Sequence, residues 1–310
     1  MKTHEPVRIL FRQAAGMALV AAGLMLAAAP ASAQTAAPLL VDVQWLSQHL
    51  NDRDLVVLHV GTKADYEAGH IPGARLISED EVSKPHDMAK MAQGDLMLEL
   101  PPVGDLRGKV ASFGISDDSR IVVYFGKTTA VQSSTRIVFT LDYLGMGDRT
   151  SLLNGGMAAW IRAGKATSLE RPSFSPGTLM TRAPKNVVAD AAFVKSLAGR
   201  PNHRLVDARA AVFYRGIEPT MNGAKGHIPG AINIPFSQMT DNNQLIDRDR
   251  VAALFQAAGV KAGETIVAYC HVGQQATAVV FAARLLGHPV MLYDGSFQDW
   301  ATNVHGPVEP

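Results

Sequence analysis

The sequence predicts an α/β protein made of two similar halves, each a mostly parallel β-sheet flanked by helices. The first observation is a repeat: Gly69-His-Ile-Pro-Gly-Ala74 recurs 157 positions later as Gly226-His-Ile-Pro-Gly-Ala231. The second is that short apolar runs typical of strands alternate with helical runs in both halves. The third is that each half closes with a glycine turn followed by a tryptophan, Trp160 or Trp300. A repeat on this scale indicates two domains of ordinary size.

Two strands of each half can be located from apolar runs bounded by polar residues. In each half one run precedes the repeated motif and another follows it. The runs are 54–60 and 119–125 in the first half, and 203–208 and 264–270 in the second. Because a helical run follows the second strand of each half, the strands are expected to lie parallel.

The first segment has the pattern of a secretory signal peptide. Three basic residues precede an uncharged, largely apolar stretch, 13–34, that contains Ala31-Ser-Ala33. The small residues favour cleavage after Ala33 and a periplasmic or secreted mature protein; the alternative is an uncleaved N-terminal anchor. Cleavage would leave 277 residues with a formal net charge of −1. This charge does not favour nucleic acid or an anionic membrane surface as a partner of the mature form.

The predicted domain layout therefore has four parts. Between the halves, residues 166–184 carry three prolines and no sustained hydrophobic period, which is typical of a linker. The parts are a signal peptide at 1–33, an N-terminal domain at 39–165, the linker at 166–184 and a C-terminal domain at 185–310.

Cys270 is the only cysteine among 310 residues, and it follows an apolar run just before a helical run, 277–286. A thiol in this place faces loop N–H groups and the positive end of a helix, and both favour the thiolate. We therefore expect Cys270 to be a nucleophile with a pKa below the ordinary thiol range. The alternative is an inert, buried, small apolar residue.

The residues that follow Cys270 form the candidate active-site loop. Their N–H groups would hold the thiolate and then a persulfide in turn. Ten histidines are scattered along the chain, so the sequence predicts neither a metal site nor a cofactor. The loop residues are His271, Val272, Gly273, Gln274, Gln275 and Ala276.

Taken together, these motifs resemble those of the tandem-domain rhodanese sulfurtransferases. The resemblance runs from about Val41 to Val308 and rests on the order of the motifs rather than on any one of them. The motifs are the repeated His-Ile-Pro-Gly-Ala, Trp45-Leu-Ser-Gln-His-Leu50, Tyr269-Cys-x-x-Gly-x-x-Ala276, and Tyr293-Asp-Gly-Ser296 with Trp300.

The resemblance implies two rhodanese-like domains, a silent first domain and a catalytic second one. Cys270 would accept a sulfane sulfur as a persulfide and pass it to cyanide or a thiol. The sequence itself indicates which half is silent, because Phe125 aligns opposite Cys270 and its loop carries three extra residues. Lys127 in that loop is either a surface lysine or a positive charge near the domain interface.

Several positions depart from the family pattern around the substrate. The two residues after the family's cysteine are basic in thiosulfate enzymes and Gly-Ser in 3-mercaptopyruvate enzymes, whereas here they are His271 and Val272. The serine of the 3-mercaptopyruvate enzymes acts with a histidine and an aspartate, and those positions fall on His70 and His59. That relay therefore lacks two of its three members.

The family's substrate-binding arginine aligns with Phe213 in this chain. Arg215, two residues further on, is a candidate substitute because a guanidinium can bind a pair of anionic oxygens. Arg209 is a second candidate, although its Asp-x-Arg pattern resembles an internal ion pair. Both arginines also have the alternative of purely structural or surface roles.

Three functions remain open at this level. The first is transfer of sulfane sulfur from thiosulfate or a similar small anionic donor to cyanide or a thiol. The second is the same transfer from 3-mercaptopyruvate. The third is an exported persulfide carrier that exchanges sulfur with another protein and has little small-molecule turnover. A cysteine-dependent phosphatase is disfavoured, because residues 270–276 lack the additional residue and the arginine that such a loop needs.

Overall fold

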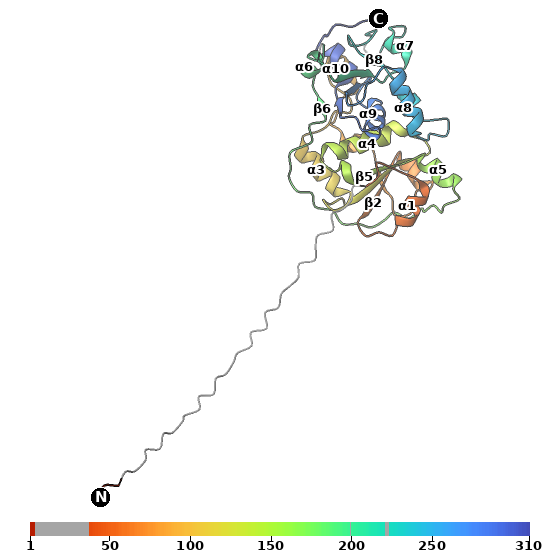
Figure 1. The fold of residues 1–310 in the computed structure, drawn as a ribbon. Helices are drawn as coiled ribbons and strands as arrows, with labels where there is room; N and C mark the ends of the chain where they lie inside the picture. Colours follow the sequence, from red (N-terminus) through yellow and green to blue (C-terminus); the bar gives the residue numbers. More distant parts are fainter. Residues whose placement is uncertain (4–36, 199, 221–222) are drawn as a thin grey trace. The chain divides into compact units, whose positions relative to one another are not determined.

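Each half of the chain folds around a five-stranded parallel sheet in the computed structural model (Figure 1). The structure describes residues 1–3, 37–198, 200–220 and 223–310. The predicted signal peptide, apart from its first three residues, and the predicted cut after Ala33 lie outside the described residues. Among the described residues, no helix has the length and apolar character needed to cross a bilayer.

The sheet of the first half has the strand order β1-β5-β4-β2-β3. Its central strands are β2 and β4, whose residues are almost all buried, as expected for strands covered on both faces. The strands are β1 (Leu40–Val41), β2 (Leu55–Val60), β3 (Arg75–Ile77), β4 (Arg120–Phe125) and β5 (Thr150–Leu153). The α-helices are α1 (Val43–His49), α2 (Lys63–Glu67), α3 (Val103–Ser112), α4 (Val131–Tyr143) and α5 (Gly156–Arg162).

The sheet of the second half repeats this arrangement as β6-β10-β9-β7-β8. The strands are β6 (Val188–Ala189), β7 (His203–Asp207), β8 (Ile232–Asn233), β9 (Thr265–Tyr269) and β10 (Val290–Tyr293). The α-helices are α6 (Ala191–Lys195), α7 (Ala211–Tyr214), α8 (Arg248–Ala257), α9 (Ala276–Leu285) and α10 (Ser296–Thr302). Short 3₁₀ turns lie at Asp80–Val82, Met88–Gln93, Gly147–Arg149 and Phe236–Gln238. The prediction of two α/β units with parallel sheets is confirmed.

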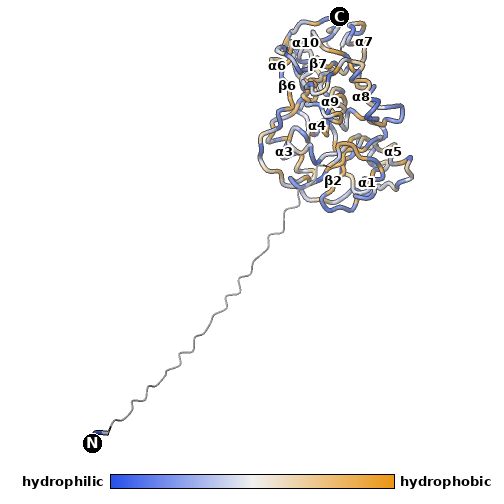
Figure 2. Tube along the Cα trace, in the orientation of Figure 1, coloured by the Kyte–Doolittle hydropathy of each residue, from blue (hydrophilic) through white to orange (hydrophobic). Residues whose placement is uncertain are grey.

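Three hydrophobic clusters hold the fold together. One cluster runs through both halves and includes side chains of β4 and α4 together with side chains of β9 and α9. The other two clusters lie within the first and the second half, respectively, and contain Trp160 and Trp300. In contrast to these apolar clusters, the loop that precedes α8 is hydrophilic (Figure 2). The two halves therefore share a core in addition to having their own.

The repeated His-Ile-Pro-Gly-Ala motif fastens a turn to a helix in both halves. His70 stacks on Tyr66 and His227 stacks on Tyr214, each with ring centroids 3.8 Å apart. Each tyrosine hydroxyl in turn donates to the alanine carbonyl that ends the motif, at 2.7 Å from Tyr66 and 2.8 Å from Tyr214. These contacts give the motif a scaffolding role, and they make Tyr66 and Tyr214 structurally equivalent.

Candidate functional site

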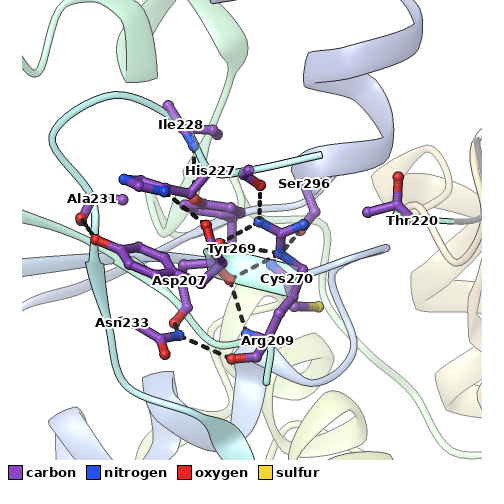
Figure 3. Close-up of polar contacts among 12 residues, drawn as sticks. Asp207, Arg209, Thr220, His227, Ile228, Ala231, Asn233, Tyr269, Cys270 and Ser296 are labelled. Atoms are coloured by element: carbon purple, nitrogen blue, oxygen red, sulfur yellow. Dashed lines mark hydrogen bonds and ion pairs between the residues drawn. The ribbon is translucent and has the colours of Figure 1, made fainter. Parts of the chain in front are cut away.

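Cys270 is the first residue after β9, at the carboxyl end of the second sheet. Its N–H donates to the Ser296 hydroxyl at 3.1 Å, and its carbonyl accepts the Phe297 N–H at 3.0 Å. The Ser296 hydroxyl donates to the Tyr293 carbonyl at 2.8 Å, which fixes its orientation. The turn from β10 into α10 therefore holds both sides of the Cys270 backbone, and Figure 3 shows the side that Ser296 contacts.

The thiol of Cys270 is fully buried, with 0% of the residue exposed. Burial raises the pKa of the Cys270 thiol, while N–H groups of Ala276, Val272 and Gly273 lower it and the Asp207 carboxylate raises it. The cradle of N–H groups expected from the sequence is present. The expected fall in pKa is wrong, because removal of the thiolate from water outweighs the stabilisation that the loop amides provide.

Glycine is required at one position of the candidate loop. Gly273 has a φ of 81°, and a Cβ there would come within 2.4 Å of the Asp294 carbonyl oxygen. The tight turn brings the Val272 and Gly273 N–H groups back toward the cysteine. Ala276 is buried and begins α9, and the Gln275 side-chain oxygen is buried without a hydrogen-bond partner among the described residues.

The His271 ring packs on an aromatic neighbour. Its ring meets the Phe213 ring edge-on, with centroids 4.7 Å apart and an angle of 88°. Burial, with a smaller contribution from the Arg209 charge, lowers the pKa of His271 to about 4. His271 is therefore uncharged at neutral pH, and Phe213, predicted from the sequence to align with the family's substrate-binding arginine, forms an apolar wall beside it.

Arg209 is completely buried and is bound chiefly to Asp207. Its Nε donates to both Asp207 oxygens at 3.0 and 3.1 Å, its Nη2 lies 2.5 Å from Asp207 Oδ2, and Nη2 also donates to the Gly226 carbonyl at 2.8 Å. The guanidinium carbon lies 4.0 Å from the centroid of the Phe297 ring. Its Nη1 has no hydrogen-bond partner among the described residues. Arg209 thus forms a structural ion pair and keeps one buried N–H₂ group without a partner among the described residues.

Arg215 is not brought to the loop by the contacts of the described residues. It is exposed, and its Nε donates to the carbonyl of Ala211 at 3.4 Å within its own turn. Lys127 is likewise exposed. Cys270 and the residues that follow it form the turn from β9 into α9, and their catalytic role and a contact between Arg215 and a substrate stay predictions.

Comparison with known proteins identifies the fold family. The family model described as a rhodanese-like domain matches residues 42–163 and 190–303, more than half of the chain. The chain belongs to the rhodanese family. Its two halves are rhodanese domains, and the predicted resemblance is confirmed.

Several relatives are named as sulfurtransferases. A probable 3-mercaptopyruvate sulfurtransferase of Pseudomonas aeruginosa is 32% identical over 287 residues, covering 87% of this chain and 97% of the relative. A thiosulfate sulfurtransferase of Gallus gallus is 27% identical, covering 93% and 94%. A sulfur carrier protein of Thermus thermophilus is 30% identical, covering 87% and 95%. The protein is a sulfurtransferase, as the sequence predicted.

Solved structures support the same fold. The structure of wild-type EanB aligns with a TM-score of 0.75 at 20% identity, covering 89% of this chain and 70% of that chain. The structure of YnjE aligns with a TM-score of 0.76 at 22% identity, covering 87% and 68%. At this level of identity the match concerns the fold alone.

In the first rhodanese domain, a buried carboxylate lies beside the loop that follows β4, which is the loop equivalent to the one after Cys270. Asp65 Oδ2 accepts the Thr128 N–H at 3.2 Å and lies 3.7 Å from His59 Nε2. His59 Nδ1 lies 2.9 Å from the Tyr124 hydroxyl, and burial lowers the pKa of His59 to about 4. The backbone of the loop after Phe125 is thus bound by the Asp65 side chain of the same domain.

The predicted histidine positions of a 3-mercaptopyruvate relay lie in this first domain. Both His70 ring nitrogens lie 2.9 Å from backbone carbonyl oxygens, those of Tyr66 and Glu170. His59 is engaged with Tyr124 and Asp65. Neither histidine has a contact with Cys270 among the described residues.

Sequence reasoning missed a set of polar residues through which the first domain reaches the catalytic loop. Arg136 donates to the Gly273 carbonyl at 3.3 Å, and Gln274 Nε2 donates to both Glu79 oxygens at 2.9 and 2.8 Å. A signal was present in the sequence, since Gln132-Ser-Ser-Thr-Arg136 is a polar run in a helix expected to be packed. The run has no counterpart at the start of α9, which is largely apolar.

Proposed function

We propose that Cys270 is the nucleophile of this sulfurtransferase and carries the transferred sulfur as a persulfide. The observation that carries the proposal is the convergence of the Val272, Gly273 and Ala276 N–H groups on a single cysteine at the end of β9. Such a cradle stabilises a sulfur anion, whether it is the thiolate or the outer sulfur of the persulfide.

The first half-reaction begins with attack of the Cys270 thiolate on the outer sulfur of thiosulfate. A sulfur–sulfur bond forms to Cys270, the sulfur–sulfur bond of the donor breaks, and sulfite leaves with the electron pair. In the second half-reaction cyanide or a thiolate attacks the outer persulfide sulfur, the new sulfur–sulfur bond breaks, and the Cys270 thiolate is restored. The charge is balanced in both steps, and no cofactor takes part.

The buried state of the thiol sets two conditions on this reaction. Because burial raises the pKa of Cys270, the thiolate population and the rate of persulfide formation increase as pH rises toward and beyond the ordinary thiol range. Because no part of Cys270 is exposed, a donor reaches the sulfur only when neighbouring side chains move. Phe213 and His271 are the partly buried pair beside the loop.

The test of the nucleophile is the intact mass of the protein after incubation with thiosulfate. We expect one added sulfur in the wild type, its loss on addition of cyanide, and no addition in Cys270→Ser. A wild-type protein that gains no sulfur from any sulfane donor would disprove the proposal.

For the donor we propose thiosulfate or a similar small anionic sulfane compound, with 3-mercaptopyruvate as the alternative. Relatives named for each donor support the pair of candidates. Two groups are candidates for binding the anion, the buried Nη1 of Arg209, which has no partner among the described residues, and the exposed Arg215. Cyanide or a small thiol is the proposed acceptor.

Steady-state kinetics with both donors in the wild type and in Arg215→Ala would test this choice. A lost anion contact should lower kcat/KM about tenfold for each roughly 1.4 kcal/mol of binding. Arg53→Ala is the matched control, because Arg53 is also an exposed arginine. A thiosulfate kcat/KM below that for 3-mercaptopyruvate would reverse the order of the donors.

A persulfide carrier is the second candidate function, and the relative named as a sulfur carrier protein favours it. A carrier would take up sulfur rapidly from a persulfidated protein while its turnover of thiosulfate and cyanide stayed near background. Comparing the two rates on the same preparation separates a carrier from an enzyme acting on small molecules.

We further propose that the mature protein is exported to the periplasm or secreted, with cleavage after Ala33. The basic start, the apolar stretch 13–34 and the small residues at 31–33 support this proposal. Expression of the full chain in a bacterium with a periplasm, followed by N-terminal sequencing, should give a chain that starts at Gln34. A membrane-bound chain that retains Met1 would indicate an uncleaved anchor instead.

A further inference from the structure

Four consecutive polar residues in the first two turns of α4, in the domain without a cysteine, are buried. Ser133, Ser134, Thr135 and Arg136 are all buried, although a helix normally turns its polar residues to solvent. The Thr135 and Thr277 hydroxyls lie 2.8 Å apart, so this face of α4 lies against the start of α9. Burying polar groups is unfavourable unless they have partners. The Ser134 hydroxyl has none among the described residues, whereas Ser133 and Arg136 have partners that indicate what this face does.

The partners of Arg136 lie on and beside the catalytic loop. Its side chain is 1% exposed, and its Nη1 lies 2.5 Å from Asp294 Oδ1 and 3.3 Å from the Gly273 carbonyl oxygen. Its Nη2 donates to the Leu98 carbonyl. A guanidinium is well suited to this task, because its planar donors bind several acceptors at fixed angles.

Asp294 connects the same contact to the turn that holds Cys270. It lies at the end of β10, directly before the turn whose Ser296 hydroxyl accepts the Cys270 N–H. Its second oxygen accepts the Leu100 N–H of the first domain at 2.8 Å. The first domain therefore holds both the catalytic loop and the neighbouring turn.

Glu79 forms a second contact one residue further along the loop. Both of its oxygens accept the Gln274 amide, at 2.9 and 2.8 Å, and the Ser133 hydroxyl lies 3.4 Å from the same nitrogen. Gln274 therefore points away from Cys270 and toward the first domain. The first domain therefore binds two successive loop residues, the carbonyl of Gly273 and the side chain of Gln274.

From this geometry we infer that Arg136 and Glu79 are positioning residues that keep the catalytic loop in its anion-binding shape. The inference deepens the proposed function, on which it rests. The Gly273 N–H is one of the groups directed at Cys270, and its direction depends on the backbone angles that the two contacts restrain. Loss of either contact lets the loop amides turn away from the sulfur. The silent domain thus takes part in the chemistry without touching the substrate.

The experiment compares Arg136→Met with Arg136→Lys and with the control Arg120→Met. Arg120 is an arginine of the same domain that binds Asp52 and Asp54 at 2.5 and 2.8 Å. The readouts are kcat/KM for the sulfur donor and the pH profile of Cys270 alkylation by an uncharged reagent, which reports the thiol pKa. We expect Arg136→Met to lower kcat/KM about tenfold or more and to shift the alkylation profile to higher pH. For Arg136→Lys, kcat/KM and the alkylation profile should lie between those of the wild type and Arg136→Met. Arg120→Met should keep the wild-type alkylation profile.

A second pair of variants keeps the test decisive if Arg136→Met does not fold. Glu79→Ala and Gln274→Ala remove the two ends of one contact, so their effects on the alkylation profile should not add in the double variant. Folded Arg136 and Glu79 variants with the wild-type profile and kcat/KM would overturn the inference. A wild-type protein that alkylates at Cys270 but never forms a persulfide would instead disprove the proposed function, because alkylation does not depend on sulfur transfer.

Discussion

The loops that leave the central strands of the two rhodanese domains are closed by different side chains at equivalent positions. Tyr66 and Tyr214 are equivalent, so the residues just before them, Asp65 and Phe213, are equivalent too. Asp65 accepts a loop N–H in the first domain, whereas Phe213 packs on His271 in the second. In the first domain the Asp65 carboxylate accepts a loop N–H. In the second domain the loop N–H groups are directed at the Cys270 sulfur instead.

The two domains also differ in the buried ionisable residues at the ends of β7 and β2. In the second domain Asp207 is bound to Arg209, two residues further along the chain. At the equivalent positions of the first domain stand His59 and Gly61, and His59 has Asp65 as its neighbour instead. A Cβ at Gly61 would lie 2.8 Å from His59 Nε2, so no longer side chain fits there without a shift. The repeat thus preserved the scaffold while the charges at the sheet edge changed.

The strongest test of this comparison moves the cysteine to the silent domain. We expect a Phe125→Cys, Cys270→Ser double variant to gain no sulfur from thiosulfate, because the nearby Asp65 charge disfavours a second anion. The measurement is the intact mass after incubation, with the wild type as the positive control and Cys270→Ser as the background. A persulfide on residue 125 would show that the two loops are chemically interchangeable.

The second test uses the pH dependence of stability. His59 has a pKa of about 4 in the folded chain against an ordinary value of 6.5, so between these values the unfolded state binds more protons. Stability from this group is fully present above about pH 6.5 and is lost as pH falls to about 4, by roughly 3 kcal/mol at most.

Urea unfolding at several pH values between 7 and 4 measures this loss. His59→Gln should show a flatter dependence than the wild type over the same range, since glutamine does not titrate. Equal slopes in the two proteins would mean that His59 is not held in its neutral form by the first domain.

The third test removes the internal anion. Asp65→Ala leaves the Thr128 N–H without its partner and opens a gap beside His59, so we expect the free energy of unfolding to fall by about 2 kcal/mol. Asp65→Asn should cost less, because its amide oxygen still accepts a hydrogen bond. The control is Asp118→Asn, an exposed aspartate expected to change stability by less than about 0.5 kcal/mol. No loss in Asp65→Ala would show that the carboxylate does not stabilise the loop.

The repeat made the fold predictable, and the apolar run before Cys270 made the place of its loop predictable. The helix predicted from residue 277 begins at Ala276, and Cys270 follows its strand directly, because local apolar patterns determine both elements. The direction of the Cys270 pKa shift was not predictable in this way, since it depends on complete burial by distant segments.

The contacts between the domains were also not predictable from the sequence, because they join segments that are far apart along the chain. Arg136 and Asp294 are 158 positions apart, and no local pattern pairs them. The difference in charge between the two sheet edges was also hidden, because it requires knowing that Asp65 and Phe213 occupy equivalent places. Local periodicity predicts elements, whereas the chemistry of this site depends on pairings across the fold.

The last test converts the apolar wall of the catalytic domain into a cation. Phe213→Arg places a guanidinium at the wall beside His271, where it can bind an anionic donor, so we expect kcat/KM for thiosulfate to rise about tenfold, or roughly 1.4 kcal/mol. Phe213→Leu is the control for loss of the aromatic contact alone and should not raise kcat/KM. If both variants lower kcat/KM equally, the aromatic pair itself supports catalysis, and the wall is a functional part of the loop rather than a site left without its arginine.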